Sequence, residues 1–397
     1  MVLTGILAKE YLLISMQYPI NLQTRTESPI LERSSRRLLT AIATFGAVVF
    51  IAHSLLAQPQ QTEPATALIN PQAIVFNPVT GKVYAVDQSR GAVNITDDIE
   101  NSTLRVKVGA GPVSIAVNSA NGRAYVVNAE DGTVSVIDGK TDAVVATVSV
   151  GNHPYSIAAN GATGKVYVSH TYSNQLTIID GATNIPTAIK TGSADLIAVN
   201  SKTNTIYLLG YESSNLTVLD GVSQTLAARP TGMHLWGVAL NEASGTVYVA
   251  QSGSADIAVL ENNTIPASII ETGTIPCALA INPTTNTVYV INYGDNSVTV
   301  IDGTKNHAIA SVPTGNHPQA VAIDIAANLI YVANTRANTV TVIDGASNTV
   351  LATLEAGKNP YALAIDSRFG KLHVANLDDK SFTIIDVHKI RKPTRGS

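Results

Sequence analysis

The sequence has few of the residues on which covalent cross-links, thiolate metal sites and charged surfaces depend. Its 397 residues include one cysteine, one tryptophan, five phenylalanines and three methionines, and only 14% are charged. A single cysteine excludes internal disulfides, thiolate zinc knuckles and a Cys-x-x-Cys redox pair. A net charge of −4 argues against a dedicated nucleic-acid binder, which is usually basic. The apolar fraction of 45% is too high for a disordered chain.

Familiar catalytic motifs are also missing. Phosphate-binding glycine loops, His-Glu-x-x-His and Gly-x-Ser-x-Gly do not occur in a convincing context. Beyond the N-terminal segment no stretch has the period of a long amphipathic helix. The sequence therefore favours a non-catalytic protein and leaves an enzyme open as the alternative.

The N-terminal segment has the features of an export signal. Arg33, Arg36 and Arg37 precede an uncharged apolar stretch over 38–52, and the small residue Ala57 precedes a polar segment. This order is typical of a secretory signal peptide. We therefore predict an exported protein of the periplasm or cell surface.

Two alternatives concern this segment. Residues 38–57 are long enough to act as an uncleaved membrane anchor. Met16 is an alternative start that would shorten the polar lead. The predicted organisation is an export signal or anchor over 1–57, a linker over 58–64, one domain over 65–388 and a tail over 389–397.

A unit of about 41 residues recurs eight times. Its most regular feature is Val-Tyr-Val-x-Asn, in which His373 takes the place of the eighth tyrosine. The seven tyrosines are Tyr84, Tyr125, Tyr167, Tyr207, Tyr248, Tyr289 and Tyr331. A residue type that is needed in every unit holds the unit together, so we assign these tyrosines a structural role.

Each unit contains four short β-branched stretches separated by Asn, Asp and Gly, which are hairpin turn residues. Four strands per 40 residues predict one blade of a β-propeller. The fold class is therefore all-β, an eight-bladed propeller, with seven blades as the alternative. The last unit stops after its third strand, so we expect a strand over 65–69 to complete that blade and close the ring.

The repeats resemble a known family. Tyr331-Val-Ala-Asn334 followed by Val340-Thr-Val-Ile-Asp344, together with Gly-Asn-His-Pro links between units, resembles the YVTN-type β-propeller repeat family. The resemblance extends over about 65–388. It implies an exported or cell-surface bacterial or archaeal propeller, often without a defined activity and commonly with seven blades.

Candidate site residues lie in the links between blades and in the loops on the same face, near the channel mouth. Histidines occupy one link position in blades 3, 5 and 7. They suggest ligands for a metal or cofactor, and the alternative is a turn residue. No metal, cofactor or catalytic residue is assigned. The predicted ligand-binding residues are His153, Tyr155, His170, His234, Trp236, His317, Gln319, Asn359 and Tyr361.

Three further features bear on chemistry. The loops between second and third strands are acidic, which favours a cationic or polyhydroxylated ligand or, alternatively, a solvated rim. His170 beside His153 is the best candidate for a general base. Cys277, in an apolar setting, is expected to be a buried structural thiol.

Two functional hypotheses follow. The first is a monomeric, non-catalytic binding or structural module at the cell envelope, with a protein, glycan or small ligand as partner and no nucleic acid. The second is a metal-dependent lactonase or lyase, or a redox propeller with a haem-like or quinone cofactor, that uses the channel-mouth histidines. A fold alone does not choose between them.

Overall fold

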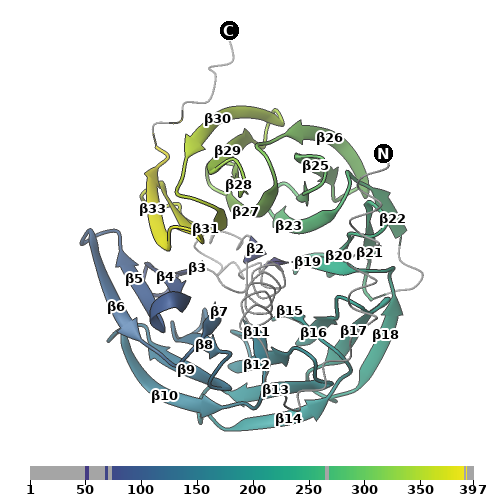
Figure 1. Cartoon of the computed structure of the whole chain (residues 1–397). Helices are drawn as coiled ribbons and strands as arrows, with labels where there is room; N and C mark the ends of the chain where they lie inside the picture. The colour runs from purple at the N-terminus through teal and green to yellow at the C-terminus, as the bar shows by residue number, and fades with distance from the viewer. Residues whose placement is uncertain (1–49, 53–67, 70–73, 264–267, 389, 391–397) are drawn as a thin grey trace, which may run out of the picture. The chain divides into compact units, whose positions relative to one another are not determined.

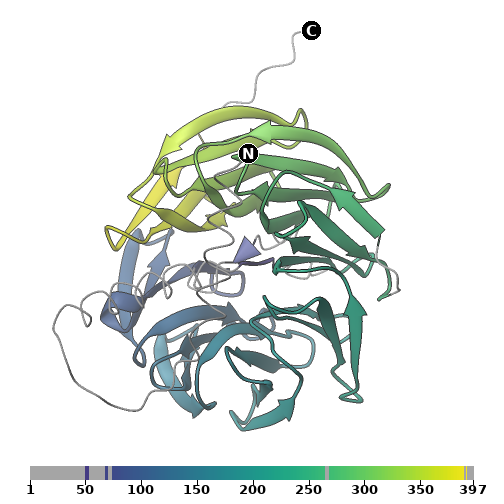
Figure 2. The same ribbon diagram turned by 45° about the vertical axis from the view of Figure 1, so that its right-hand side comes forward.

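The computed structural model describes residues 50–52, 68–69, 74–263, 268–388 and 390. Its strands form eight sheets, arranged as the blades of a ring, and the consecutive strands of each blade are antiparallel (Figure 1). Consecutive blades follow one another around this ring in both views (Figure 2). The prediction of an all-β, eight-bladed propeller is confirmed, and the seven-bladed alternative is wrong.

Blades 1 to 4 contain four strands each. Their bounds are β3 (Ile74–Asn77), β4 (Lys82–Asp87), β5 (Ala92–Asp97) and β6 (Ser102–Lys107); β7 (Pro112–Val117), β8 (Ala124–Asn128), β9 (Thr133–Asp138) and β10 (Ala143–Ser149); β11 (Pro154–Ala159), β12 (Lys165–His170), β13 (Gln175–Asp180) and β14 (Pro186–Lys190); β15 (Leu196–Asn200), β16 (Thr205–Leu209), β17 (Asn215–Asp220) and β18 (Leu226–Pro230). A 3₁₀ turn, η1 (Gln88–Arg90), joins β4 to β5.

Blades 5 to 8 repeat this order. Their bounds are β19 (Leu235–Asn241), β20 (Thr246–Gln251), β21 (Asp256–Leu260) and β22 (Ser268–Glu271); β23 (Pro276–Asn282), β24 (Thr287–Asn292), β25 (Ser297–Asp302) and β26 (His307–Pro313); β27 (Pro318–Asp324), β28 (Leu329–Asn334), β29 (Thr339–Asp344) and β30 (Thr349–Glu355); β31 (Pro360–Asp366), β32 (Lys371–Asn376) and β33 (Ser381–Asp386). Within the described residues blade 8 has three strands.

The hairpin turns form because an asparagine, or in blades 7 and 8 an aspartate, closes the first strand. In blade 3, Asn160 Oδ1 accepts hydrogen bonds from the backbone N–H groups of Ala162 and Thr163 at 2.9 and 3.1 Å. Gly164 then takes a left-handed conformation, with φ of 73°, which glycine adopts without steric cost. Side-chain bonds of this kind favour turns over continued strand.

The repeated tyrosines fill the interfaces between neighbouring blades, and all seven are fully buried. Tyr248 Oη in blade 5 donates to Asn306 Oδ1 of blade 6 at 3.1 Å. A side chain at Gly345 of blade 7 would bring its Cβ within 2.7 Å of the Tyr289 hydroxyl of blade 6. Gly181 of blade 3 lies in the same way against the Tyr125 hydroxyl of blade 2. The burial of all seven tyrosines and these contacts between blades agree with a structural role.

The expected closing strand is placed differently in the structure. β2 (Leu68–Ile69) pairs with β1 (Phe50–Ala52), and β1 pairs in parallel with β19, the inner strand of blade 5. Figure 1 shows β2 inside the ring. The prediction that a strand over 65–69 pairs with β33 and completes blade 8 is therefore wrong for the described residues. A short apolar strand satisfies its backbone groups on any free edge, and sequence does not specify which one.

Blades 8 and 1 meet at the ring-closing interface, which carries charged side chains. Arg368 Nη2 of blade 8 donates to Asp366 Oδ2 at 2.7 Å and to the Gly81 carbonyl of blade 1 at 2.5 Å. The Arg368 guanidinium also lies over the Phe76 ring, 5.1 Å from its centroid. Arginine thus joins these two blades by hydrogen bonds and by a cation–π contact.

His373 replaces the repeated tyrosine at the ring-closing interface. Its Nε2 donates to Asp98 Oδ2 of blade 1 at 2.7 Å, and Lys371 Nζ lies 3.6 Å from Asp98 Oδ1. Burial acts to raise the pKa of Asp98, but the His373 hydrogen bond and the positive charges of His373 and Lys371 outweigh burial and hold that pKa below its usual range. The ionised form of Asp98 therefore stabilises the closed ring.

The predicted signal or anchor over 1–57 lies outside the described residues except for β1, and so does the linker over 58–64. In the part of the chain that the structure describes, no helix has the length and apolar character needed to cross a membrane.

Candidate functional site

The three link histidines share a left-handed backbone conformation. His153, His234 and His317 have φ values of 52°, 56° and 55°, and Asn359 and Gly111 occupy the same position with 56° and 61°. Asparagine and glycine are the residues that adopt this conformation most readily. In His153 and His317 the carbonyl accepts an N–H from the loop between the second and third strands of its own blade, at 3.0 and 2.9 Å. The link position is therefore a turn that histidine occupies in three blades.

Each of these histidines lies beside a tyrosine. The ring centroids are 6.5 Å apart for His153 and Tyr172 and 4.5 Å apart for His317 and Tyr293. Among the described residues no three His, Cys, Asp or Glu side chains are close enough to hold one metal ion. The structure therefore does not bring the three imidazoles to a common centre.

His170 is fully occupied by neighbouring groups. The ring is buried, its Nδ1 donates to the Asn152 carbonyl at 2.9 Å, and its Nε2 lies 2.8 Å from Thr177 Oγ1. Burial lowers the pKa of His170, and the charge of His153 lowers it further, while the Asn152 carbonyl acts to raise it. A general base needs a nitrogen within reach of substrate. The prediction that His170, beside His153, acts as a general base is therefore wrong.

The other predicted positions separate into surface and core. Gln319 and Asn359 are half-buried, whereas Tyr361 is buried in the core shared by blades 8 and 1. Asn359 Nδ2 donates to Asp378 Oδ1 at 3.1 Å and so stabilises the link. Cys277 is buried and burial raises the pKa of its thiol, which agrees with the predicted structural role. None of these four residues supplies a reactive group to the face.

An aromatic cluster forms on blades 3 to 5, and it comprises Tyr155, Tyr211, His234 and Trp236 with Asp195. The Tyr211 ring lies 5.4 Å from the His234 ring and 5.9 Å from the Trp236 ring, between centroids. The Tyr211 N–H donates to Asp195 Oδ2 at 2.8 Å. Tyr155 and Trp236 both pack against the core of blades 4 and 5. This cluster is the largest gathering of predicted site residues on the face.

The carboxyl group of the aromatic cluster has a perturbed environment. Burial raises the pKa of Asp195, the Tyr211 N–H partly offsets this, and the charge of Glu212 raises it further. Burial and the charge of Asp195 also raise the pKa of the Tyr155 hydroxyl. The cluster thus offers ring faces, of which Tyr211 is 40% exposed, next to a hydrogen-bonding carboxyl group. Perturbed groups of this kind gather at functional sites.

Asp195 was not among the residues predicted from sequence, although a signal for it exists. Six of the eight links carry proline before the first strand, and the other two carry Asp195 and Leu235 in its place. These two links are neighbours in the ring and both contribute to the aromatic cluster. A paired departure from the repeat therefore marks the site.

The acidic rim has a largely structural explanation. Asp131 and Asp295 each accept an N–H from the adjoining link at 2.6 Å, and Asp379 accepts one at 3.0 Å. These carboxylates hold the links in place. Their presence does not by itself indicate a cationic ligand.

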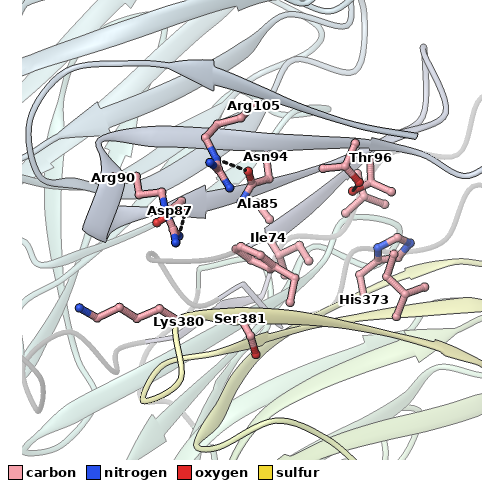
Figure 3. A pocket seen from close by; sticks show the side chains of 14 residues that line it. Ile74, Ala85, Asp87, Arg90, Asn94, Thr96, Arg105, His373, Lys380 and Ser381 are labelled. Carbon is pink, nitrogen blue, oxygen red and sulfur yellow. Dashed lines mark hydrogen bonds and ion pairs between the residues drawn. The ribbon is translucent and has the colours of Figure 1, made fainter. Parts of the chain in front are cut away.

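The structure also shows a cavity that the sequence does not predict. It has a volume of about 340 Å³ and lies between blade 1 and blade 8 (Figure 3). Its blade 1 wall is formed by residues of β3 to β6 and of η1, and its blade 8 wall by His373, Lys380 and β33. Sequence alone cannot find such a space, because it depends on how two blades separated by the whole chain meet.

Comparisons with known proteins agree with the fold. A family model described as YNCE-like beta-propeller matches residues 185–368. That match supports a β-propeller family, and it does not single out the YVTN-type family that the repeats resemble. No curated protein is a significant match.

Two solved structures share the architecture at low identity. Hydrazine synthase from Kuenenia stuttgartiensis has a TM-score of 0.55 at 17% identity, over 85% of this chain and all of the other. The dihydro-heme d1 dehydrogenase NirN, in complex with DHE, has a TM-score of 0.66 at 14% identity, over 87% of this chain and 77% of the other. At these identities the likeness shows the fold alone.

Proposed function

We propose that this protein is an exported, non-catalytic binding module that contacts its ligand through the aromatic cluster of blades 3 to 5. The observation that supports this most is the exposed Tyr211 ring, which lies against His234 and Trp236 and beside the carboxyl of Asp195. The repeat does not require these residues, because the two links that contribute to the cluster depart from its proline. Residues that occur in only one or two of eight blades are not needed to form a blade, so we assign them to ligand binding.

The chemistry of the cluster favours a glycan ligand. Aromatic side chains provide large, rigid contact surfaces with a polar edge. The Asp195 oxygens can accept hydrogen bonds from sugar hydroxyls, and the ring faces can cover apolar sugar C–H groups. An organic cation is the other ligand that aromatic faces and a carboxylate attract, and the experiment below distinguishes the two.

Export is part of the proposal and rests on the N-terminal signal. The basic residues, the apolar stretch over 38–52 and Ala57 are those of a secreted or anchored protein. Fractionation of cells that produce the full chain should place it in the periplasm or at the cell surface. N-terminal sequencing of that material distinguishes cleavage after Ala57 from an uncleaved anchor.

Ligand binding can be measured directly because Trp236 is the sole tryptophan. Titration of the purified protein with neutral oligosaccharides should change its intrinsic fluorescence, and titration with a quaternary ammonium compound should not. Tyr211→Ala should weaken binding at least tenfold. Tyr293→Ala is the matched control, because Tyr293 also lies against a link histidine, in another blade. Equal loss in both variants, or no response to any oligosaccharide, would contradict the proposal.

The second candidate is an enzyme with a metal or a haem-like cofactor, suggested by the histidines and by the similarity in fold to the dihydro-heme d1 dehydrogenase NirN. The residues present do not fit one shared group. His153 and His317 lie against separate tyrosines, and His317 Nδ1 contacts Asn316 Oδ1. An absorption spectrum and metal analysis of the purified protein test this candidate. A chromophore or stoichiometric metal that is lost in a His153, His234 and His317 triple alanine variant would replace the binding proposal.

A further inference from the structure

The cavity between blades 1 and 8 lies where the repeat is interrupted. β33 is the last strand of its blade in the described part of the chain, and its Ile384 is 46% exposed. The equivalent Val342 in blade 7, which has a fourth strand, is completely buried. Phe382 and Ile384 thus form an apolar wall of the cavity instead of being covered.

The opposite wall carries polar residues where other blades have apolar ones. Thr96 stands before the aspartate that ends the third strand, and the residue at that place in the other seven blades is isoleucine or leucine. Those residues are Ile137, Ile179, Leu219, Leu260, Ile301, Ile343 and Ile385. Asp87 occupies a second exceptional position, which is Asn in four other blades and acidic in none. With His373 in place of tyrosine, three departures from the repeat face one cavity.

The charges around the cavity do not cancel. Asp87 is buried and accepts hydrogen bonds from Arg90 at 2.9 Å and Ser89 at 2.8 Å. The positive charge of Arg90 therefore balances the negative charge of Asp87. Arg105 Nε donates to the neutral Asn94 Oδ1 at 3.2 Å. Within the described residues neither Arg105 nor Lys380 forms an ion pair. The cavity therefore has two positive charges in excess.

The positive charges and the hydroxyl groups lie in different parts of the cavity. Figure 3 shows Arg90 and Lys380 toward one end and Thr96 and His373 toward the other. The hydroxyl groups of Thr96 and Thr103 line the second end. A volume of about 340 Å³ is at the lower end of the range for small-molecule sites. A ligand of one ring with an acidic group at one end and hydroxyls at the other matches this arrangement.

We propose that this cavity binds a small hydroxylated organic anion, whose acidic group lies between Arg105 and Lys380 and whose body lies against Phe382 and Ile384. A carboxylate and a phosphate share this chemistry, because both accept the planar donors of arginine. The site is separate from the aromatic cluster of blades 3 to 5. It does not depend on the function proposed for that cluster.

Calorimetric titration of the purified full chain tests the proposal with three probes, which are glucuronate, glucose 6-phosphate and glucose. At least one of the two anions should bind saturably and more weakly as salt rises, and the neutral sugar should not bind. Binding of glucuronate alone assigns a carboxylate ligand, and binding of glucose 6-phosphate alone assigns a phosphate. Failure of both anions to bind overturns the proposal.

Variants locate the binding site within the molecule. A double variant with Arg105→Gln and Lys380→Gln should weaken anion binding at least tenfold. Arg336→Gln is the control for charge, because Arg336 is a cation of the corresponding loop in blade 7, and it should bind as the wild type does. Equal loss in the control would show general charge attraction and contradict the site.

Thr96→Ile separates binding from folding. It restores the residue that the other blades carry and fills part of the cavity. We expect a protein that has lost anion binding at least tenfold but keeps the circular dichroism spectrum and the urea unfolding transition of the wild type. Undiminished anion binding in this variant would place the anion elsewhere and overturn the proposal.

Discussion

The interface between blades 6 and 7 and the ring-closing interface between blades 8 and 1 hold the same backbone arrangement by different means. In the first, the buried Tyr289 meets Gly345, and Asn282 Nδ2 donates to Asn328 Oδ1 at 2.8 Å. In the second, His373 donates to Asp98, and Arg368 supplies the donor group that Asp366 lacks. Uncharged close packing depends little on solution conditions. An ion-assisted contact depends on protonation, and here it adjoins a cavity.

A third interface shows the opposite use of a carboxyl group. Glu242 of blade 5 is buried and accepts the Ser201 N–H of blade 4 at 3.1 Å through Oε1. Burial raises the pKa of Glu242 to about 7, although the Ser201 N–H and the charge of Lys202 act to lower it. Asp98 stabilises its interface when ionised, whereas Glu242 stabilises its interface when protonated. A repeat fold thus accommodates interfaces of opposite pH dependence.

The largest expected effect is the loss of a repeated tyrosine. Tyr289→Ala should lower the free energy of unfolding by about 3–5 kcal/mol, because it removes a fully buried aromatic ring and leaves a cavity. Urea denaturation followed by circular dichroism measures the change. Tyr172→Ala is the control, since that ring is 92% exposed and should cost less than about 0.5 kcal/mol. Similar losses in both variants would refute the structural role of the tyrosine position.

Glu242→Gln should stabilise the protein at pH 8 and leave it nearly unchanged at pH 4. An unfolded glutamate has a pKa of about 4.3, and the folded value is about 7. The native state therefore binds the proton more tightly, and its stability falls as pH rises between these values. At roughly 1.4 kcal/mol per pKa unit, the variant should gain about 3–4 kcal/mol at pH 8. Equal effects at both pH values would show that Glu242 is not protonated in the native protein.

Conversion of the ring-closing interface to the ordinary kind should remove its acid sensitivity. Asp98→Gly alone should cost about 2 kcal/mol, because a hydrogen bond to a charged group is lost. His373→Tyr alone should also destabilise, because Asp98 occupies the space that Gly345 leaves free for Tyr289. The double variant reproduces the Tyr289–Gly345 pair and should be more stable than the two single losses predict.

The acid dependence of this double variant provides the readout. The pKa of Asp98 is held below its unfolded value of about 3.9, so its contribution is present above that pH and is lost as pH falls through the folded pKa. Unfolding measured between pH 5 and pH 3 should be less steeply pH-dependent in the double variant than in the wild type. An unchanged slope would mean that Asp98 does not control the acid sensitivity of ring closure.

The smallest effect is expected at the link position. His317→Asn should change the free energy of unfolding by only a few tenths of a kcal/mol, since Asn359 occupies the same left-handed position in the next blade. Thermal unfolding by calorimetry is sufficient to measure it. His317→Pro is a sharper companion, because proline fixes φ near −65° and removes the N–H that His317 donates to Asn296 Oδ1. A large loss with asparagine would show that the imidazole itself is required.

The sequence was sufficient for the ring because its structural residues repeat. Tyrosine, asparagine and glycine recur at fixed spacing, and each of the eight repeats predicts the same hairpins. His373 was visible as an exception, but Asp98 was not, since a partner 275 residues away in sequence is established only by the closed ring. Closure by a strand over 65–69 was predicted from pattern alone, and pattern does not fix which edge a short strand joins.

The candidate site was predictable only in part. His153, His234 and His317 lie in the links between blades, but the contacts that give a histidine its role come from residues that only the folded blade brings beside it. His170 is an example, because the Asn152 carbonyl and Thr177 occupy its two nitrogens. Asp195 could have been found as a departure from the link proline. The cavity between blades 1 and 8 could not be predicted from sequence, because its walls come from the first and last blades and their packing depends on ring closure.

Ring closure also determines how this molecule should respond to force. Seven interfaces join blades that follow one another in the chain, so covalent bonds span them, whereas blades 8 and 1 are held by noncovalent contacts within the described residues. Tension applied between β3 and β33 is carried in parallel by the His373–Asp98 and Arg368–Gly81 hydrogen bonds. The ring should therefore open first at this interface. The force needed to separate blades 8 and 1 would then depend on a few charged side chains. After this separation the blades would unfold one at a time from an open end.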